Sequence, residues 1–293
     1  MDERFVQVGI QPVPAPRIKR ARWYEGKPVV SMAVLAVICL GCLCCHWFIP
    51  KDSAYMDLFH THHAPDGEFW FGTDAMGRDV FSMIWYGGRA SLSIGFLAAA
   101  ISTAVAILFG AISGLAPKWL DGLLMRLTEI FLSIPNLLLV VLLQAVLGKA
   151  NALSISFVIG VTGWPGIAKV VRTEVRRLRS CEYVIAARCM GAGFWHVTLK
   201  HLTPNLVSAI MFMVVMNIRG AIAAESTLSF MGIGLPLEVI SWGGMLSQAE
   251  RSLLSGCWWI ILIPGVFLVV TLLCVTNIGN HLRESVNRGE SNL

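Results

Sequence analysis

The sequence predicts an all-α membrane protein with six transmembrane helices and both termini in the cytoplasm. Three features indicate this class: 56% of the 293 residues are hydrophobic, only 14% are charged, and the apolar residues are concentrated in six long runs. Soluble chains carry about 25% charged residues. The net charge of +5 is small and no Lys/Arg stripe alternates with aromatic residues, which argues against disorder and against nucleic-acid binding.

Each of the six runs is long enough to cross a membrane. A bilayer takes about 20 apolar residues as a helix, because no water is present to satisfy the backbone polar groups. The first run is too long, and too far from Met1, for a cleaved signal peptide, so we expect it to be retained. The fifth run continues through Arg219 and Glu225 to Gly232. The predicted spans are residues 29–49, 90–116, 130–148, 150–168, 201–218 and 252–280.

The distribution of basic residues predicts the orientation of these spans. With the N-terminus inside, sixteen Lys and Arg residues fall on the inner side and five on the outer side, and cytoplasmic loops carry the excess. Residues 1–28 and 281–293 then form cytoplasmic tails, and residues 50–89 form an external loop with an interfacial helix. Residues 90–280 form a five-helix core that includes a cytoplasmic loop at 170–200. We find no internal repeat of the kind that inverted-repeat transporters show.

Four of the eight cysteines lie in the first predicted span. Disulfide scaffolds are short, secreted and loop-rich, unlike this chain. Cys42, Cys44 and Cys45 beside His46 could form a metal site. Small polarizable side chains also pack well in a bilayer helix, and we favour packing.

The inner loop contains a short predicted helix that ends at two glycines. Ala186 and Ala187 offer a flat surface, and Gly191 and Gly193 let the backbone turn where a side chain would block it. These features suit a helix that a partner protein contacts, although an amphipathic linker lying on the membrane would also show them.

The spacing of this loop resembles the EAA loop of ATP-binding-cassette (ABC) importer permeases, whose short coupling helix docks into a groove of a cytoplasmic ATPase. The sequence departs from that motif at Ile185, where an acidic residue usually stands, and at Thr203, which replaces a leucine. We expect residues 185–197 to be rigidly tied to the fourth and fifth spans. The resemblance implies these coupling residues: Glu182, Ile185, Ala186, Ala187, Gly191, Gly193 and Pro204.

Two other motifs resemble the C-type permease subunits of oligopeptide, dipeptide and nickel importers. Phe-Gly-Thr-Asp-x-x-Gly-Arg-Asp begins at Phe71, and Leu-Ser-Phe-Met-Gly-Ile-Gly begins at Leu228 and is followed by Trp242-Gly243. The proline pair usual after the second motif is reduced to Pro236, and the usual Gly-Asp near the C-terminus is Gly279-Asn280.

The first of these motifs predicts a surface near the outer interface. Its Gly-Thr-Asp turn suits a helix N-cap. Val80, Phe81, Ile84 and Trp85 then share one helical face, so we expect an interfacial helix that helps to receive a substrate-binding protein. The residues of this external motif are Gly72, Thr73, Asp74, Gly77, Arg78 and Asp79.

The resemblance implies a type I ABC importer permease fold in a prokaryotic cytoplasmic membrane. It also implies four kinds of partner: a homologous second permease, two ABC ATPases, an extracytoplasmic binding protein and the lipid bilayer. The chain lacks a Gly-x-x-x-x-Gly-Lys-Ser/Thr phosphate loop, since Gly26-Lys27 precedes Pro28 and Gly148-Lys149 precedes Ala150. We therefore expect a non-catalytic subunit without a cofactor, and ATP hydrolysis in the partners.

Ionisable residues inside predicted spans are candidates for function, because their insertion costs about 2.5 to 3.5 kcal/mol. Glu225 and Arg219 are six positions apart and do not share a helix face cleanly, which favours pairing across helices or solvation in a translocation pathway. Arg126 and Glu129 are spaced for a pair with each other. Pro135 permits a kink in the third span.

The external histidines leave the cargo open. His60, His62 and His63 could bind a metal or a metal chelate, or could be solvated side chains. Peptide import is the preferred function, and nickel or metal-chelate import is the first alternative. A stand-alone channel or secondary transporter is the second alternative, although such proteins place charges inside several spans, and these spans are nearly bare.

Overall fold

The computed structural model describes residues 28–49, 55–148, 150–236, 238–250 and 256–290. These residues form helices and loops, with one isolated β-bridge between Thr73 and Asp79. The predicted N-terminal tail lies outside them except for Pro28, as do the first residues predicted for the sixth span. The helices are α1 (Val29–Phe48), α2 (Val80–Leu115), α3 (Lys118–Ser133), α4 (Asn136–Leu147), α5 (Ala152–Arg179), α6 (Glu182–Cys189), α7 (Phe194–Val197), the π-helical turn η1 (Thr198–Leu202), α8 (Thr203–Phe230), α9 (Trp242–Glu250) and α10 (Trp259–Glu290).

Five of these helices are long and apolar enough to span a membrane: α1, α2, α5, α8 and α10. The third predicted span, residues 130–148, is not one continuous helix. It falls on the pair α3 and α4, which is bent by 90° at its break, and with this pair counted as one span the total is six. Ile134 takes an extended conformation (φ −92°, ψ 130°) because the ring of Pro135 disfavours a helical residue before it. The predicted kink at Pro135 is therefore a full break, whereas α5 continues through Pro165.

Residues 80–89, predicted to lie in an interfacial helix, do not form a helix of their own, because they are the first turns of α2. The Asp79 carboxylate caps this helix, accepting hydrogen bonds from the backbone N–H groups of Phe81 (3.3 Å) and Ser82 (3.1 Å). Val80 and Ile84 are 0% exposed and pack in a hydrophobic cluster with α1, α9 and α10. The apolar face that suggests an interfacial helix is thus buried against other helices.

Helices α2 and α5 pack together through glycines. A Cβ on Gly110 would lie 2.6 Å from the carbonyl oxygen of Ala168, and one on Gly114 would lie 2.8 Å from Cγ1 of Val175. Small residues at Gly110 and Gly114 therefore let the two helices approach closely.

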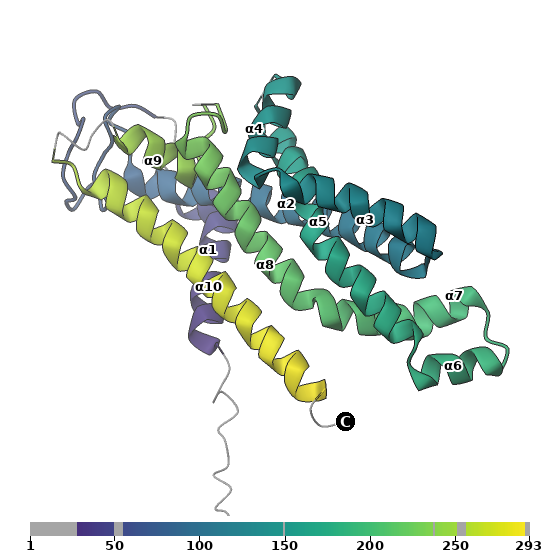
Figure 1. Cartoon of the computed structure of the whole chain (residues 1–293). Helices are drawn as coiled ribbons and strands as arrows, with labels where there is room; N and C mark the ends of the chain where they lie inside the picture. The colour runs from purple at the N-terminus through teal and green to yellow at the C-terminus, as the bar shows by residue number, and fades with distance from the viewer. Residues whose placement is uncertain (1–27, 50–54, 149, 237, 251–255, 291–293) are drawn as a thin grey trace, which may run out of the picture.

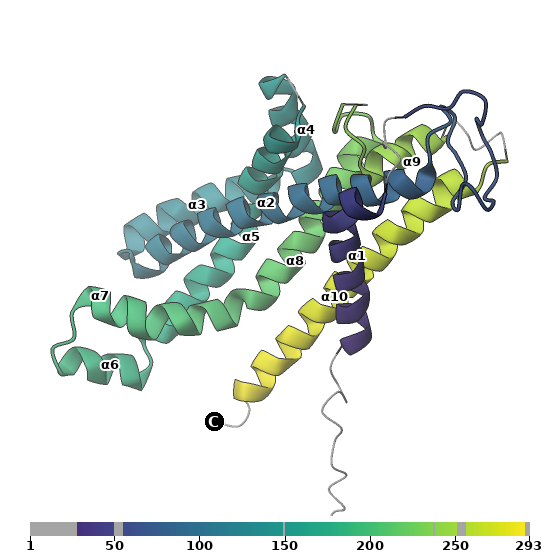
Figure 2. The same cartoon turned by 180° about the vertical axis from the view of Figure 1, so that it is seen from behind.

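The two ends of the bundle carry different segments. Figure 1 shows the start of α1, the end of α10 and the pair α6 and α7 toward one end, and Figure 2 shows the same arrangement from behind. Helix α9 and the loop at residues 55–79 lie at the opposite end. The two large loops of the sequence therefore belong to opposite ends of the molecule.

Replacing Gly110 with alanine should lower the thermal unfolding midpoint of the detergent-solubilised protein. The added methyl must displace the backbone of α5, and overpacking of this kind costs about 1–3 kcal/mol. Gly122→Ala is the matched control, because no atom lies within 4 Å of a Cβ at this position in α3. Equal midpoints for the two variants would contradict the tight α2–α5 contact.

Candidate functional site

Helices α6 and α7 form a short projection between the ends of α5 and α8. Its inner face joins the hydrophobic cluster at the ends of those two helices: Val184 is 0% exposed and Ala187 6%. Members of that cluster along the chain are Val175, Leu178, Val184, Val197, Leu202 and Leu206. The buried side chains of the projection, Val184 on α6 and Val197 on α7, therefore pack in one cluster with residues of α5 and α8.

The turn after α6 requires a glycine. Gly191 has φ +87°, a left-handed conformation that L-residues rarely adopt. Its N–H donates to the carbonyl of Arg188 (3.0 Å), and the N–H of Ala192 donates to the carbonyl of Ala187 (3.0 Å). These two bonds form a Schellman motif, which satisfies the last carbonyls of the helix. Gly193 has no positive φ and no neighbour within 4 Å of its Cβ position.

The outer face of α6 is exposed and partly apolar. Ile185 is 50% exposed, Tyr183 is 43% exposed and Met190 is 82% exposed. Glu182, Ala186 and Arg188 are also exposed. The predicted flat surface of two alanines is wrong, because successive helical residues point about 100° apart: Ala186 faces outward while Ala187 faces the core. Pro204 lies in the first turn of α8 and is exposed.

A polar cluster surrounds Glu225 near the C-terminal end of α8. The Glu225 side chain is fully buried, and its carboxylate accepts hydrogen bonds from the hydroxyls of Ser229 (2.9 Å) and Ser226 (3.4 Å). The hydroxyls of Ser91 and Ser241, from α2 and the residue before α9, also hydrogen-bond to it. The carboxylate thus joins three segments, and it does not face an open pathway on this chain.

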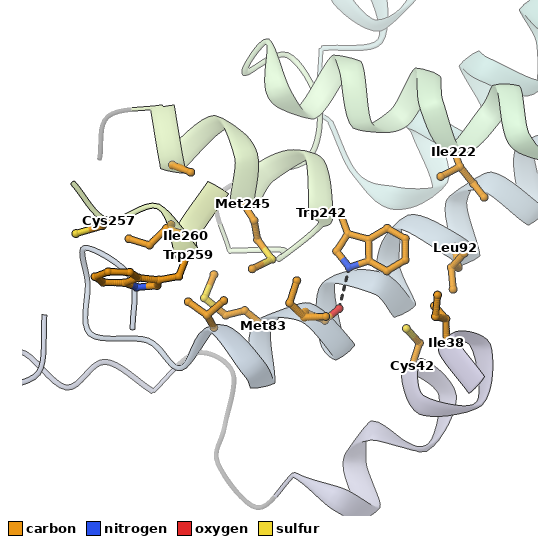
Figure 3. Packing of buried hydrophobic residues seen from close by; sticks show 13 residues of the cluster. Ile38, Cys42, Met83, Leu92, Ile222, Trp242, Met245, Cys257, Trp259 and Ile260 are labelled. Carbon is orange, nitrogen blue, oxygen red and sulfur yellow. Dashed lines mark hydrogen bonds between the residues drawn. The ribbon is translucent and has the colours of Figure 1, made fainter. Parts of the chain in front are cut away.

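Trp242 completes the packing of α9 on α2. Its indole N–H donates to the carbonyl of Ile84 (2.9 Å), and its backbone N–H donates to the hydroxyl of Ser91 (3.2 Å). Figure 3 shows the Trp242 indole among the side chains of the surrounding cluster, with its hydrogen bond drawn as a dashed line. A pocket of about 340 Å³ lies beside these residues and is lined by Ser229, residues 232–236 and residues 239–241 among others.

Arg219 has a different environment from Glu225. It lies near the middle of α8, and its side chain is exposed. No ion pair or hydrogen bond joins it to another residue in the part of the chain that the structure describes. The predicted pairing of Arg126 with Glu129 is confirmed, with 3.1 Å between Nη1 and Oε2.

The external motif is a buried framework. Asp74 (6% exposed) and Arg78 (4% exposed) form an ion pair with 2.6 Å between Oδ2 and Nη2, and Arg78 also donates to the side chain of Gln248 on α9. Gly72 and Gly77 have positive φ and lie against the backbone of residues 57 and 63. Thr73 is fully buried, and its hydroxyl donates to the carbonyl of His60. The contact of Arg78 with Gln248 holds the loop on α9, and the side chains of Thr73, Asp74 and Arg78 are buried, not exposed for a partner.

The external histidines do not converge on one point. His60 Nδ1 lies 2.8 Å from Asp57 Oδ2, and His63 Nδ1 lies 3.0 Å from the carbonyl of Ala64. His62 has φ +55° and its ring contacts the thiol of Cys257 (3.4 Å) instead. The backbone N–H of Phe69 lowers the pKa of the nearby Asp66 carboxyl.

No metal site is formed by these histidines or by the cysteines of α1. Within the described ranges, no three His, Cys, Asp or Glu side chains are placed to share a metal ion. Cys42 and Cys45 are each 1% exposed, and none of the eight cysteines, all of which lie in the described ranges, forms a disulfide bond. The packing interpretation of the cysteines agrees with these findings.

Comparison with known proteins identifies the class. Residues 106–288 match the family described as the inner membrane component of binding-protein-dependent transport systems. The chain belongs to this family and is a multi-pass membrane protein, as the sequence motifs predict. Components of this kind work within larger systems, which argues against the stand-alone channel or secondary transporter.

Curated proteins similar to this chain include permeases of peptide transport systems. The chain is 36% identical over 238 residues to the dipeptide transport system permease protein DppC of Bacillus subtilis, covering 81% of this chain and 74% of that one. It is 34% identical over 271 residues to the oligopeptide transport system permease protein OppC of Haemophilus influenzae, covering 92% and 86%. The fold resembles a chain of the inward-facing MetNI methionine ABC transporter, with a TM-score of 0.57, 17% identity, and coverage of 70% and 96%.

Replacing Gly191 with alanine should loosen the end of α6. A left-handed residue with a Cβ costs about 1–2 kcal/mol, so amide hydrogen exchange of Ala192 should accelerate about five- to thirtyfold. Gly193→Ala, two positions away and without the positive φ, should leave this exchange rate nearly unchanged. The assigned role of Gly191 fails if both variants exchange like the wild type.

Proposed function

We propose that this chain is the transmembrane permease subunit of an ABC importer that carries peptides across the cytoplasmic membrane. Two separate ATPase subunits drive it, a homologous permease completes the pathway, and an extracytoplasmic binding protein delivers the cargo. The observation that carries the proposal is the projection formed by α6 and α7. It combines an exposed, partly apolar outer face with an inner face packed onto two membrane helices.

Peptide cargo is supported by the relatives, whose names describe dipeptide and oligopeptide transport. Nickel or metal-chelate import is the alternative, and the geometry of His60, His62 and His63 gives it no support. The proposed orientation places α6 and α7 in the cytoplasm, together with both ends of the chain. The excess of basic residues between Lys169 and Lys200 supports this orientation.

The outer face of α6 is proposed to contact the ATPase. Ile185, Ala186 and Tyr183 supply the contact surface, because all three are exposed. Ala187 and Gly191 act inside the projection, where one packs on the core and the other permits the turn. ATP-driven closure of the two ATPases then moves α6 and, through its packed inner face, the ends of α5 and α8.

Arg219 is proposed to face the translocation pathway or the second permease. A charged side chain near the middle of a membrane span is costly in lipid, and such residues face a protein interior or water. Glu225 is proposed instead to hold the start of α9 and the end of α8 to α2, because its carboxylate is buried among serines from those segments.

Replacing Ile185 with arginine should weaken ATPase binding. An unpaired positive charge in an apolar contact costs at least about 1.4 kcal/mol, equivalent to a tenfold loss of affinity, so co-purified ATPase should fall accordingly. Phe59→Arg is the matched control, because Phe59 is 97% exposed at the opposite end. Wild-type ATPase recovery with Ile185→Arg would count against the docking surface.

Transport by the assembled complex in proteoliposomes tests the cargo. ATP-dependent uptake of labelled di- and oligopeptides, with the cognate binding protein present, is the expected result. Uptake of Ni²⁺-histidine without peptide uptake would establish the metal alternative. Uptake by the single chain without ATPases would overturn the proposed function itself.

A further inference from the structure

Asp121 joins three helices at the end of the bundle that carries α6 and α7. Its carboxylate accepts a hydrogen bond from the hydroxyl of Ser113 on α2 (2.6 Å). It also accepts from Nη2 of Arg172 on α5 (2.6 Å) and forms an ion pair with Nη2 of Arg176 (2.7 Å). Asp121 itself lies in the first turn of α3.

The burial of this cluster indicates that the contact is more than a surface ion pair. The Asp121 side chain is 9% exposed, Arg172 is 25% exposed and Arg176 is 42% exposed. The hydroxyl of Ser113 belongs to a residue that is 0% exposed. Exposed pairs contribute about 0–1 kcal/mol, whereas removal of one partner of a buried pair costs several times more. Arg126 and Glu129, on the same helix, form an exposed pair for comparison, at 82% and 50% exposure.

Asp121 lies between the projection formed by α6 and α7 and the bent pair α3 and α4. Arg172 and Arg176 are one turn apart in the last part of α5, which ends at Arg179, and α6 begins at Glu182. On the other side, α3 runs from Asp121 to Ser133 and leads across the 90° bend into α4. The glycine packing of α2 on α5 reaches the same place, because Gly114, next to Ser113, lies against Val175 and the Arg172 backbone.

This arrangement has a mechanical consequence. The hydrophobic cluster fixes α6 to α5, so a displacement of α6 moves the end of α5. The loop between α2 and α3 contains only Ala116 and Pro117 and joins α3 to α2, not to α5. At this end the Asp121 carboxylate provides the polar contact between α3 and α5. It pairs with Arg172 and Arg176, which lie on one face of α5.

We propose that Asp121 is a positioning residue that transmits movement of the coupling projection from α5 to the bent pair α3 and α4. Two arginines and one serine hold its carboxylate so that α3 follows α5 as a unit. Without this carboxylate, α5 moves while α3 lags, and ATP hydrolysis is no longer matched by opening of the pathway. The inference rests on the proposed function, because it assigns a residue to that coupling.

Asp121→Asn in the complete transporter, reconstituted in proteoliposomes, tests the inference. The asparagine keeps the shape of the side chain but removes the charge that both arginines need. The number of peptides imported per ATP hydrolysed should fall about threefold or more, while the ATPases remain bound and active. Glu129→Gln is the matched control on the same helix, and it should keep the wild-type ratio.

Two further variants decide the question if Asp121→Asn does not assemble. Arg172→Lys keeps a cation near Asp121 and should retain most of the wild-type ratio, whereas Arg172→Gln should lower the ratio. A wild-type ratio for Asp121→Asn or Arg172→Gln would overturn the inference, as would equal losses of ATP hydrolysis and transport. Failure of the wild-type complex to import peptides would refute the proposed function instead, so the two failures are distinguishable.

Discussion

The close contact between α2 and α5 is the interaction on which the rest of the molecule depends. Hydrocarbon tails are as apolar as the helices, so association must come from close packing of surfaces and from polar contacts. Gly110, Gly114 and Gly160 remove the side chains that would separate the two backbones. This packing holds the end of α5 in place, and the projection formed by α6 and α7 begins three residues after that end.

Buried charges hold the segments that glycine packing cannot reach. Asp74 and Arg78 attach the external loop to α9, Glu225 attaches α8 to the start of α9, and Asp121 attaches α3 to α5. Each of these charges has polar partners that satisfy it, which is the condition for burying a charge in a medium of low polarity. The same chemistry therefore attaches the loop to α9 at one end of the bundle and α3 to α5 at the other.

Local patterns account for the features that were predictable. Apolar runs located the five helices that can span a membrane and part of the bent pair α3 and α4, because length and the lack of charges determine which segments a bilayer accepts. Gly191 and its turn were predictable, because only glycine adopts that backbone conformation without strain. The buried orientation of Ala187 was not predictable from the alanine pair, because helical phase alone does not say which face packs on a neighbouring element.

The role of Val80 and Ile84 also depends on tertiary packing. In the sequence they fit one face of an interfacial helix, and only the packing of α1, α9 and α10 shows that they are core residues. No local pattern in the sequence identifies Asp121 as part of an ion pair, because its partner Arg172 lies 51 positions away along the chain. An ion pair at that separation leaves no local pattern.

The sequence by itself determined the membrane class, the number of candidate spans, the family and the position of the projecting loop. These properties follow from composition, run length and short motifs, which act over a few neighbouring residues. The tertiary structure alone decided that the external motif is a buried framework, that Glu225 is enclosed by serines and that Asp121 joins three helices. These assignments depend on which distant side chains meet, and in a bundle that is settled by helix packing.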